Sequence, residues 1–148
     1  ALAELFNEKC KAYGFTSIDM SAIMDDEDAV HPAIIQLVGE KTGHTIDAAD
    51  ADKVQDLVLR IVNRSARLVA ASFTGILWQL QGAEKTLAPQ TIAVDGSVYE
   101  KMPHAKENLM KGLSELLGTD AAAVETVLEN GGSGLGAAIA AAVAASRK

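Results

Sequence analysis

Apolar residues spaced three or four positions apart predict helices over much of the first half of the chain. The first helix is expected over residues 2–13, where the pattern stops at Gly14, a residue suited to cap a helix C-terminus. The second is expected over residues 32–43, which open with proline and close with glycine. The third and longest opens within residues 47–52 and continues to about Gln81.

This long helix carries apolar residues on more than one face, which predicts a place against the centre of the fold. Small side chains within residues 66–75 would let another helix or a sheet approach closely. Arg60, Arg64 and Arg67 share a different face at helical spacing. They could contact phosphate, but a solvated face with ion pairs to acids such as Asp56 is the favoured interpretation.

Residues 15–28 show no helical periodicity and contain several hydroxyl side chains, so a loop is expected between the first two helices. The segment closes with the acidic run of residues 25–28. Asp26 or Asp28 is expected to cap the helix that follows. The run is interpreted as compensation of that helix's dipole rather than as a metal site, because no glycine turn or terminal glutamate completes a calcium loop.

The pattern changes in the second half of the chain. A short apolar run at Thr91–Val94 predicts a buried strand, and a helix opened by Pro103 and ended by Gly118 follows it. A second strand at Val124–Leu128 leads into a helix over residues 136–146. Strand, helix, strand and helix in this order predict a parallel pair with a right-handed crossover.

A glycine-rich turn follows each strand: Asp95-Gly96-Ser97 after the first, and residues 130–136 after the second. Glycine lets backbone amides approach a ligand without a Cβ in the way, and a following helix directs its N–H groups toward an anion. Because parallel sheets bind ligands at the carboxyl ends of their strands, the two turns predict a phosphate or nucleotide cradle. Plain tight connections are the alternative.

Composition narrows the classes of partner. The chain has 148 residues, 49% of them hydrophobic, which predicts one compact core. A net charge of −7 without a basic stripe argues against nucleic acid. The alanine-rich stretch of residues 137–145 is too short to cross a bilayer. The single cysteine, Cys10, suits a reducing compartment and is expected to be a packed thiol rather than a nucleophile.

The local signatures of several other enzyme classes are absent from the sequence: the GxxxxGK[ST] phosphate loop, the HExxH zinc motif, the CxxC pair and the GxSxG elbow. His31, His44 and His104 are widely scattered, and none has a ligand partner at metal spacing on its own element. Each is expected to be a surface or cap residue, and no metal ligand is assigned.

Two segments resemble the C-terminal end of a eukaryotic hexokinase: Ile92-Ala-Val-Asp-Gly-Ser-Val-Tyr-Glu-Lys-Met-Pro103 and Gly132-Ser-Gly-Leu-Gly-Ala-Ala-Ile-Ala-Ala141. Leu5-Phe6 resembles the end of a helix after the family's sugar-binding region. Ser17-Ile-Asp-Met-Ser-Ala22 resembles its adenosine triphosphate loop, most closely in the plant form, and Arg67-Leu-Val-Ala-Ala71 its long helix.

The resemblance covers nearly the whole chain and implies an α/β fold, part of an actin-like ATPase domain of the ribonuclease-H-like type. Residues 1–148 would be the C-terminal portion of the hexokinase large domain, a parallel strand-helix-strand-helix half preceded by long helices. It also implies a set of ATP-binding residues: Ser17, Ser21, Asp95, Gly96, Ser97, Gly132, Ser133 and Gly134. Hydroxyls and backbone N–H groups of this kind donate to phosphate oxygens.

The chain departs from the family pattern at two of these places. Ile18 stands where many members carry lysine, which removes a charge that could clamp phosphate. Gly131 stands where the family usually has aspartate, which loosens the second turn.

The family's reaction, as the resemblance implies it, transfers the γ-phosphoryl group of ATP, bound with Mg²⁺, to the 6-hydroxyl of a hexose, the first step of glycolysis. The general base and the sugar-contacting residues are expected upstream, so this chain alone is expected to be inactive. A cytoplasmic location is expected, with any organelle address upstream. The second interpretation is a non-catalytic, hexokinase-like interaction or scaffold module, and the third is another kinase or chaperone of the same superfamily.

Overall fold

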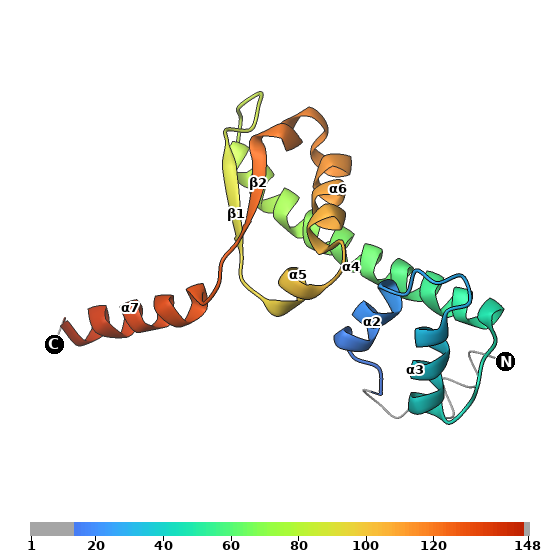
Figure 1. Ribbon diagram of the computed structural model, residues 1–148. Helices are drawn as coiled ribbons and strands as arrows, with labels where there is room; N and C mark the ends of the chain where they lie inside the picture. The colour runs from blue at the N-terminus through green and yellow to red at the C-terminus, as the bar shows by residue number, and fades with distance from the viewer. Residues whose placement is uncertain (1–13, 147–148) are drawn as a thin grey trace. The chain divides into compact units, whose positions relative to one another are not determined.

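The computed structural model describes residues 14–146 and divides into two compact units, whose helices and strands are labelled in Figure 1. Among the described residues, the first unit comprises 14–68 and 102–104, and the second comprises 69–101 and 105–146. Each unit has its own cluster of buried apolar side chains. The single core predicted from composition is therefore replaced by two smaller ones.

The first element, α2 (Ser17–Met24), occupies a segment for which a loop was expected. A capping box starts it: Asp19 Oδ2 accepts the backbone N–H of Thr16 at 2.7 Å, and Thr16 Oγ1 accepts the N–H of Asp19 at 3.4 Å. Lys41 Nζ then donates to the same carboxylate at 2.9 Å, which joins α2 to the next helix. The eight-residue helix is too short for apolar periodicity to reveal it, so its start signal is the better indicator.

The second element, α3 (Pro32–Thr42), begins and ends as predicted. Pro32 occupies the first helical turn, and Asp26 Oδ2 accepts the N–H of Ile34 at 3.1 Å, which confirms the capping role expected of the acidic run. His31 precedes the helix in a left-handed conformation with φ of 49°, and Gly43 ends it with φ of 74°. Glycine adopts that conformation without a Cβ penalty.

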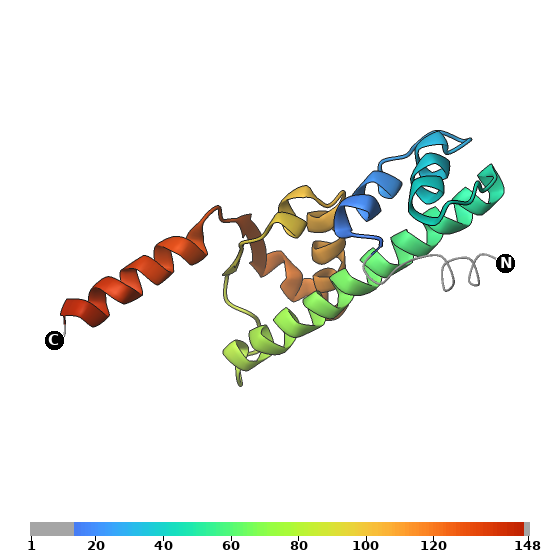
Figure 2. The same ribbon diagram turned by 90° about the horizontal axis from the view of Figure 1, so that it is seen from below.

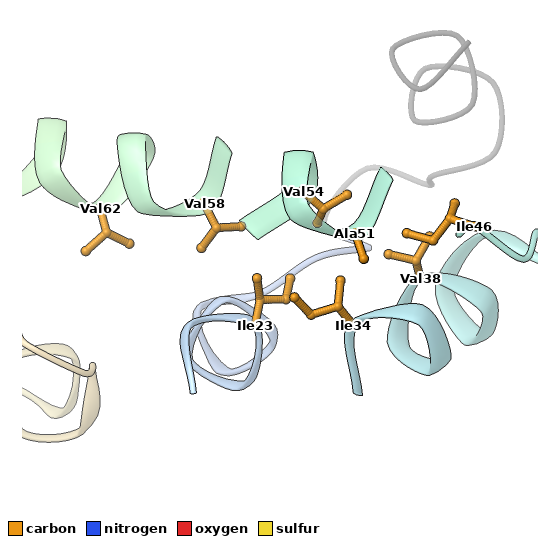
Figure 3. Close-up of a cluster of buried hydrophobic side chains, with 8 residues drawn as sticks. All are labelled: Ile23, Ile34, Val38, Ile46, Ala51, Val54, Val58 and Val62. Atoms are coloured by element: carbon orange, nitrogen blue, oxygen red, sulfur yellow. The ribbon is translucent and has the colours of Figure 1, made fainter. Parts of the chain in front are cut away.

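The core of the first unit lies between α2, α3 and the start of α4 (Ala48–Gln81), as the close-up in Figure 3 shows. Side chains from the three helices point toward one another across this space. Eight apolar residues make up the cluster: Ile23, Ile34, Val38, Ile46, Ala51, Val54, Val58 and Val62.

Helix α4 confirms the long helix predicted from residues 47–52 to Gln81, and Figure 2 shows it running without a break. Its predicted central burial holds for one stripe only. Leu57 is 53% exposed, Ile61 48% and Leu68 55%, although all three belong to the apolar pattern. Within residues 14–146, the helix therefore presents a second apolar face that is about half exposed.

The second unit contains the predicted parallel strands, β1 (Gln90–Val94) and β2 (Val124–Leu128). Gln90 pairs with Val124 at one end of the ladder and Val94 pairs with Leu128 at the other. Half-buried and exposed positions alternate along β1, so the prediction that it is a buried strand is wrong. In β2, Val124 and Thr126 are buried and Glu125 between them is exposed.

Three short elements cross from β1 to β2: α5 (Ser97–Lys101), α6 (Ala105–Leu117) and the 3₁₀ helix η1 (Gly118–Ala123). One helix opened by Pro103 was expected here, but Pro103 lies in the turn between α5 and α6. Leu109 and Leu113 of α6 are buried, whereas Leu116 is 43% exposed. The core of the second unit consists of Ala70, Leu77, Leu87, Leu109, Leu113 and Val124.

The last element, α7 (Gly132–Ser146), begins four residues before the predicted start at residue 136. Gly131 precedes it with φ of 79°, and Leu135 N donates to Gly131 O at 3.1 Å, closing the first turn. The glycines read as a long turn are therefore mostly helical. No residue of α7 is buried.

No helix within residues 14–146 is long and apolar enough to cross a membrane. The helix expected over residues 2–13, with Leu5-Phe6 and Cys10, lies outside the residues that the structure describes.

Two glycines of α3 give opposite predictions for the same substitution. Gly43→Ala should lower the free energy of unfolding by about 1 kcal/mol, because φ of 74° is strained for alanine even though the added Cβ meets nothing within 4 Å. Gly39→Ala should raise it by about 0.5 kcal/mol, since Gly39 is helical and its Cβ would sit 3.7 Å from His44 O. Urea unfolding of both variants measures the difference, and equal signs would contradict it.

The Asp19 carboxylate predicts a loss of stability in acid. Burial raises its pKa, but hydrogen bonds from Lys41 and Thr16 outweigh that effect and hold the pKa below the ordinary value of 3.8. The contribution of Asp19 to folding stability is therefore complete when the pH is above the ordinary pKa. It is lost as the pH falls through the lowered pKa of the folded protein. Unfolding free energy should fall more steeply below about pH 4 in the wild type than in Asp19→Asn or Lys41→Met. If the unfolding free energies of the wild type and both variants fall equally steeply with pH, Asp19 does not have this stabilising role.

Candidate functional site

The two predicted turns lie at the same edge of the two-stranded sheet. The strand ladder ends with Val94 opposite Leu128, and Glu129 N donates to Val94 O at 2.9 Å just beyond it. Asp95 therefore leaves β1 beside the segment that leads into α7. This juxtaposition confirms the expectation that both turns follow the carboxyl ends of parallel strands.

One carboxylate oxygen joins the two turns. Asp95 Oδ2 accepts the backbone N–H of Ser133 at 3.1 Å and its Oγ hydroxyl at 2.7 Å. The hydrogen bonds from the Ser133 hydroxyl and N–H hold the pKa of Asp95 below its ordinary value. Ser133 is the second residue of α7, so the carboxylate also faces the positive end of that helix.

Glycines give both turns backbone conformations with positive φ and leave the backbone without side chains. Gly96 has φ of 152°, and Gly131 has φ of 79°. A Cβ on Gly134 would meet nothing within 4 Å, whereas one on Gly132 would sit 4.0 Å from Asp95 Oδ2. These glycines are all exposed, as is Ser97 at the start of α5.

The predicted hydroxyls Ser17 and Ser21 belong to the first unit. Ser17 is exposed at the first position of α2. Ser21 is partly buried, and its Oγ donates to Met102 Sδ at 3.4 Å, a weak acceptor. Both glycine turns belong to the second unit. Ile18, beside Ser17, is 79% exposed.

Two hollows lie elsewhere. One of about 390 Å³ borders Arg60, Asn63, Arg64, Arg67 and Leu68 on α4. The favoured interpretation of this face is confirmed for Arg60, whose Nε donates to Asp56 Oδ2 at 2.7 Å. The other, of about 340 Å³, lies at the amino ends of the strands beside Pro89, Thr91 and Glu125, away from the glycine turns.

The histidines occupy cap and surface positions, as expected. His44 and His104 are exposed, and His31 fills the position before α3. The sequence did not reveal that His31 is buried, with Nε2 2.9 Å from Asp52 Oδ1 and Nδ1 3.9 Å from Asp26 Oδ1. Within residues 14–146, no group of three or more His, Cys, Asp or Glu side chains could hold a metal ion.

Comparisons with family models, curated proteins and solved structures all point to the same family. The family model described as Hexokinase matches residues 3–143. Hexokinase-7 of Oryza sativa subsp. japonica is 36% identical over 115 residues, covering 73% of this chain and 25% of that protein. Hexokinase-1 of Nicotiana tabacum is 36% identical over 138 residues, covering 84% and 26%. Hexokinase-2 of Rattus norvegicus is 33% identical over 133 residues, covering 88% and 14%.

The chain thus spans about a quarter or less of the length of these relatives. A solved structure entitled "Crystal structure of Hexokinase" has a similar fold, with a TM-score of 0.65 at 21% identity over 80% of this chain and 27% of that one. The fold is accordingly a part of the actin-like ATPase architecture. The chain belongs to the hexokinase family and corresponds to the C-terminal part of its large domain.

Proposed function

We propose that this chain is the nucleotide-binding part of a cytoplasmic hexokinase. The whole protein would transfer the γ-phosphoryl group of ATP to the 6-hydroxyl of a hexose. The observation that carries the proposal is the meeting of the two glycine turns at the carboxyl ends of β1 and β2, where Asp95 binds Ser133.

The residues of this edge fit a nucleotide. The first turn of α7 has N–H groups at Gly132 and Gly134 that no intrahelical carbonyl can accept, and neither residue has a side chain to keep a ligand away. The exposed hydroxyl of Ser97 adds a donor and acceptor at the start of α5. We propose that the hydroxyls of Ser17 and Ser21, in the first unit, donate hydrogen bonds to the phosphates of ATP.

Magnesium would accompany ATP in this reaction and neutralise the charge that develops on the transferred group. Mg²⁺ keeps several waters and takes further ligands from the substrate phosphates, so a site of this kind needs few protein carboxylates.

The proposal assigns catalysis to a longer polypeptide. Phosphoryl transfer depends on positioning both substrates and on neutralising charge, and the general base and sugar-binding residues are expected outside this chain. Large apolar side chains are exposed on α4 and α7. Soluble monomers rarely expose contiguous apolar surface of this kind, which supports a longer polypeptide whose other parts cover it.

A second candidate function is a non-catalytic, hexokinase-like interaction module. Two observations favour it. Ile18 is 79% exposed at a place where a clamping lysine is common in the family, so no charge is supplied there. Leu135, Ile139 and Val143 line one face of α7 at a four-residue spacing and are 65%, 55% and 44% exposed, which would suit a binding partner.

The isolated 148-residue chain should show no hexose-dependent consumption of ATP above background in a coupled sugar-phosphorylation assay. The intact polypeptide should be active under the same conditions. Substantial turnover by the isolated chain would contradict the claim that catalysis needs residues outside it. An inactive intact protein that also fails to bind ATP would favour the interaction module.

Gly134→Val in the intact protein tests whether nucleotide lies against the second turn. Its added side chain enters open space, so folding should be little affected, but the side chain would occupy the ligand's position. The KM for ATP should rise about tenfold, an effect of about 1.4 kcal/mol, while the KM for hexose stays unchanged. Ser114→Val, on the exposed face of α6, is the matched control. Equal KM values for ATP in both variants would place the nucleotide elsewhere.

A further inference from the structure

The carboxylate of Asp95 is already engaged within the protein. Its Oδ2 accepts two hydrogen bonds from Ser133, at 3.1 Å from the backbone N–H and at 2.7 Å from the hydroxyl. Both donors belong to one residue in the first turn of a 15-residue helix. A side chain that holds a backbone N–H and a hydroxyl of the same residue fixes both the position and the rotamer of that residue.

The surrounding backbone brings these groups together. Asp95 directly follows β1, and the Glu129 N–H bound to Val94 O brings the chain after β2 alongside it. A Cβ on Gly132 would stand 4.0 Å from Asp95 Oδ2, so the carboxylate lies close against the glycine turn itself. Because α7 contributes no buried side chain, packing does little to set where the helix begins.

We propose that Asp95 is a positioning residue, whose contact with Ser133 holds the second glycine turn and the start of α7 against the end of β1. This rests on the proposed function of the same site, and it changes the role of Asp95 from a nucleotide contact to a support for Ser133, Gly132 and Gly134.

Electrostatics favours this role over direct contact with phosphate. An ionised carboxylate at the N-terminus of α7 occupies the position that an anion would otherwise take at the helix dipole. Phosphate oxygens placed on the same Ser133 donors would face that carboxylate at close range, and like charges repel. The ordered N–H groups of the glycine turn are then available to the uncharged part of the nucleotide.

The first test measures amide exchange in the intact protein without ATP. Asp95→Ala should speed exchange of the Ser133 N–H about tenfold, because that N–H loses a charge-assisted hydrogen bond. Asp95→Asn should have a smaller effect, since its amide oxygen can still accept from Ser133. The control amide is Asp50 N, which donates to Asp47 Oδ1 at 2.9 Å at the start of α4 and should be unaffected. Unchanged exchange at Ser133 would overturn the proposal.

The second test is a double-mutant cycle on the KM for ATP, again in the intact protein. Asp95→Ala should raise that KM about tenfold with kcat within about twofold, and Asp95→Asn should recover part of the loss. Ser133→Ala should add little on top of Asp95→Ala, because both act on one contact. Fully additive effects, without recovery by Asp95→Asn, would identify Asp95 as a direct ligand contact and reject the positioning role.

The two tests separate the inference from the proposed function. If the intact protein binds no ATP, the proposed function fails, and the exchange measurement still decides whether Asp95 positions Ser133. If ATP binds but Ser133 exchange is insensitive to Asp95, the proposed function stands and the positioning role falls.

Discussion

The parallel pairing of β1 with β2 decides where every polar group of the glycine-rich edge lies. Val94 and Leu128 end the ladder as partners, so the two segments that leave the strands begin side by side. A parallel pair cannot be closed by a short hairpin, and α5, α6 and η1 make the crossover. A register shift of one residue would turn Val124 and Thr126 outward and separate Asp95 from Ser133.

Carboxylates at helix starts recur as structural supports in this chain. Asp19 accepts from Thr16 at the start of α2, Asp26 accepts from Ile34 at the start of α3, and Asp95 accepts from Ser133 at the start of α7. In each case backbone N–H groups that have no intrahelical acceptor are satisfied by an anion. The first two lie against buried apolar clusters, whereas Asp95 is exposed at the edge where the nucleotide is proposed to bind. The same physical contact supports a helix start in both units, and at Asp95 we propose that it also sets the geometry of the nucleotide site.

The distribution of apolar surface accounts for the balance between the two candidate functions. Helix α4 buries one stripe and exposes another, and α7 exposes all of its side chains. Such surface costs free energy in water unless something covers it. The remainder of a hexokinase fold would cover it in the proposed enzyme, and a partner protein would do so in an interaction module. The family match extends over residues 3–143, and both candidate functions lie within that family.

Sequence alone determined the features that depend on neighbouring residues: the ends of α3 at Pro32 and Gly43, the extent of α4, the bounds of β2 and the capping role of Asp26. Each follows from propensity, capping chemistry or periodicity over a few turns. Local reasoning failed at α2, which is too short to show a period, and at Gly132, where glycines suggested a turn but a helix formed. Only the tertiary structure decided which apolar face of α4 is buried and that Asp95 meets Ser133. Both depend on groups far apart in the chain, whose proximity is set by strand pairing and packing rather than by local conformation.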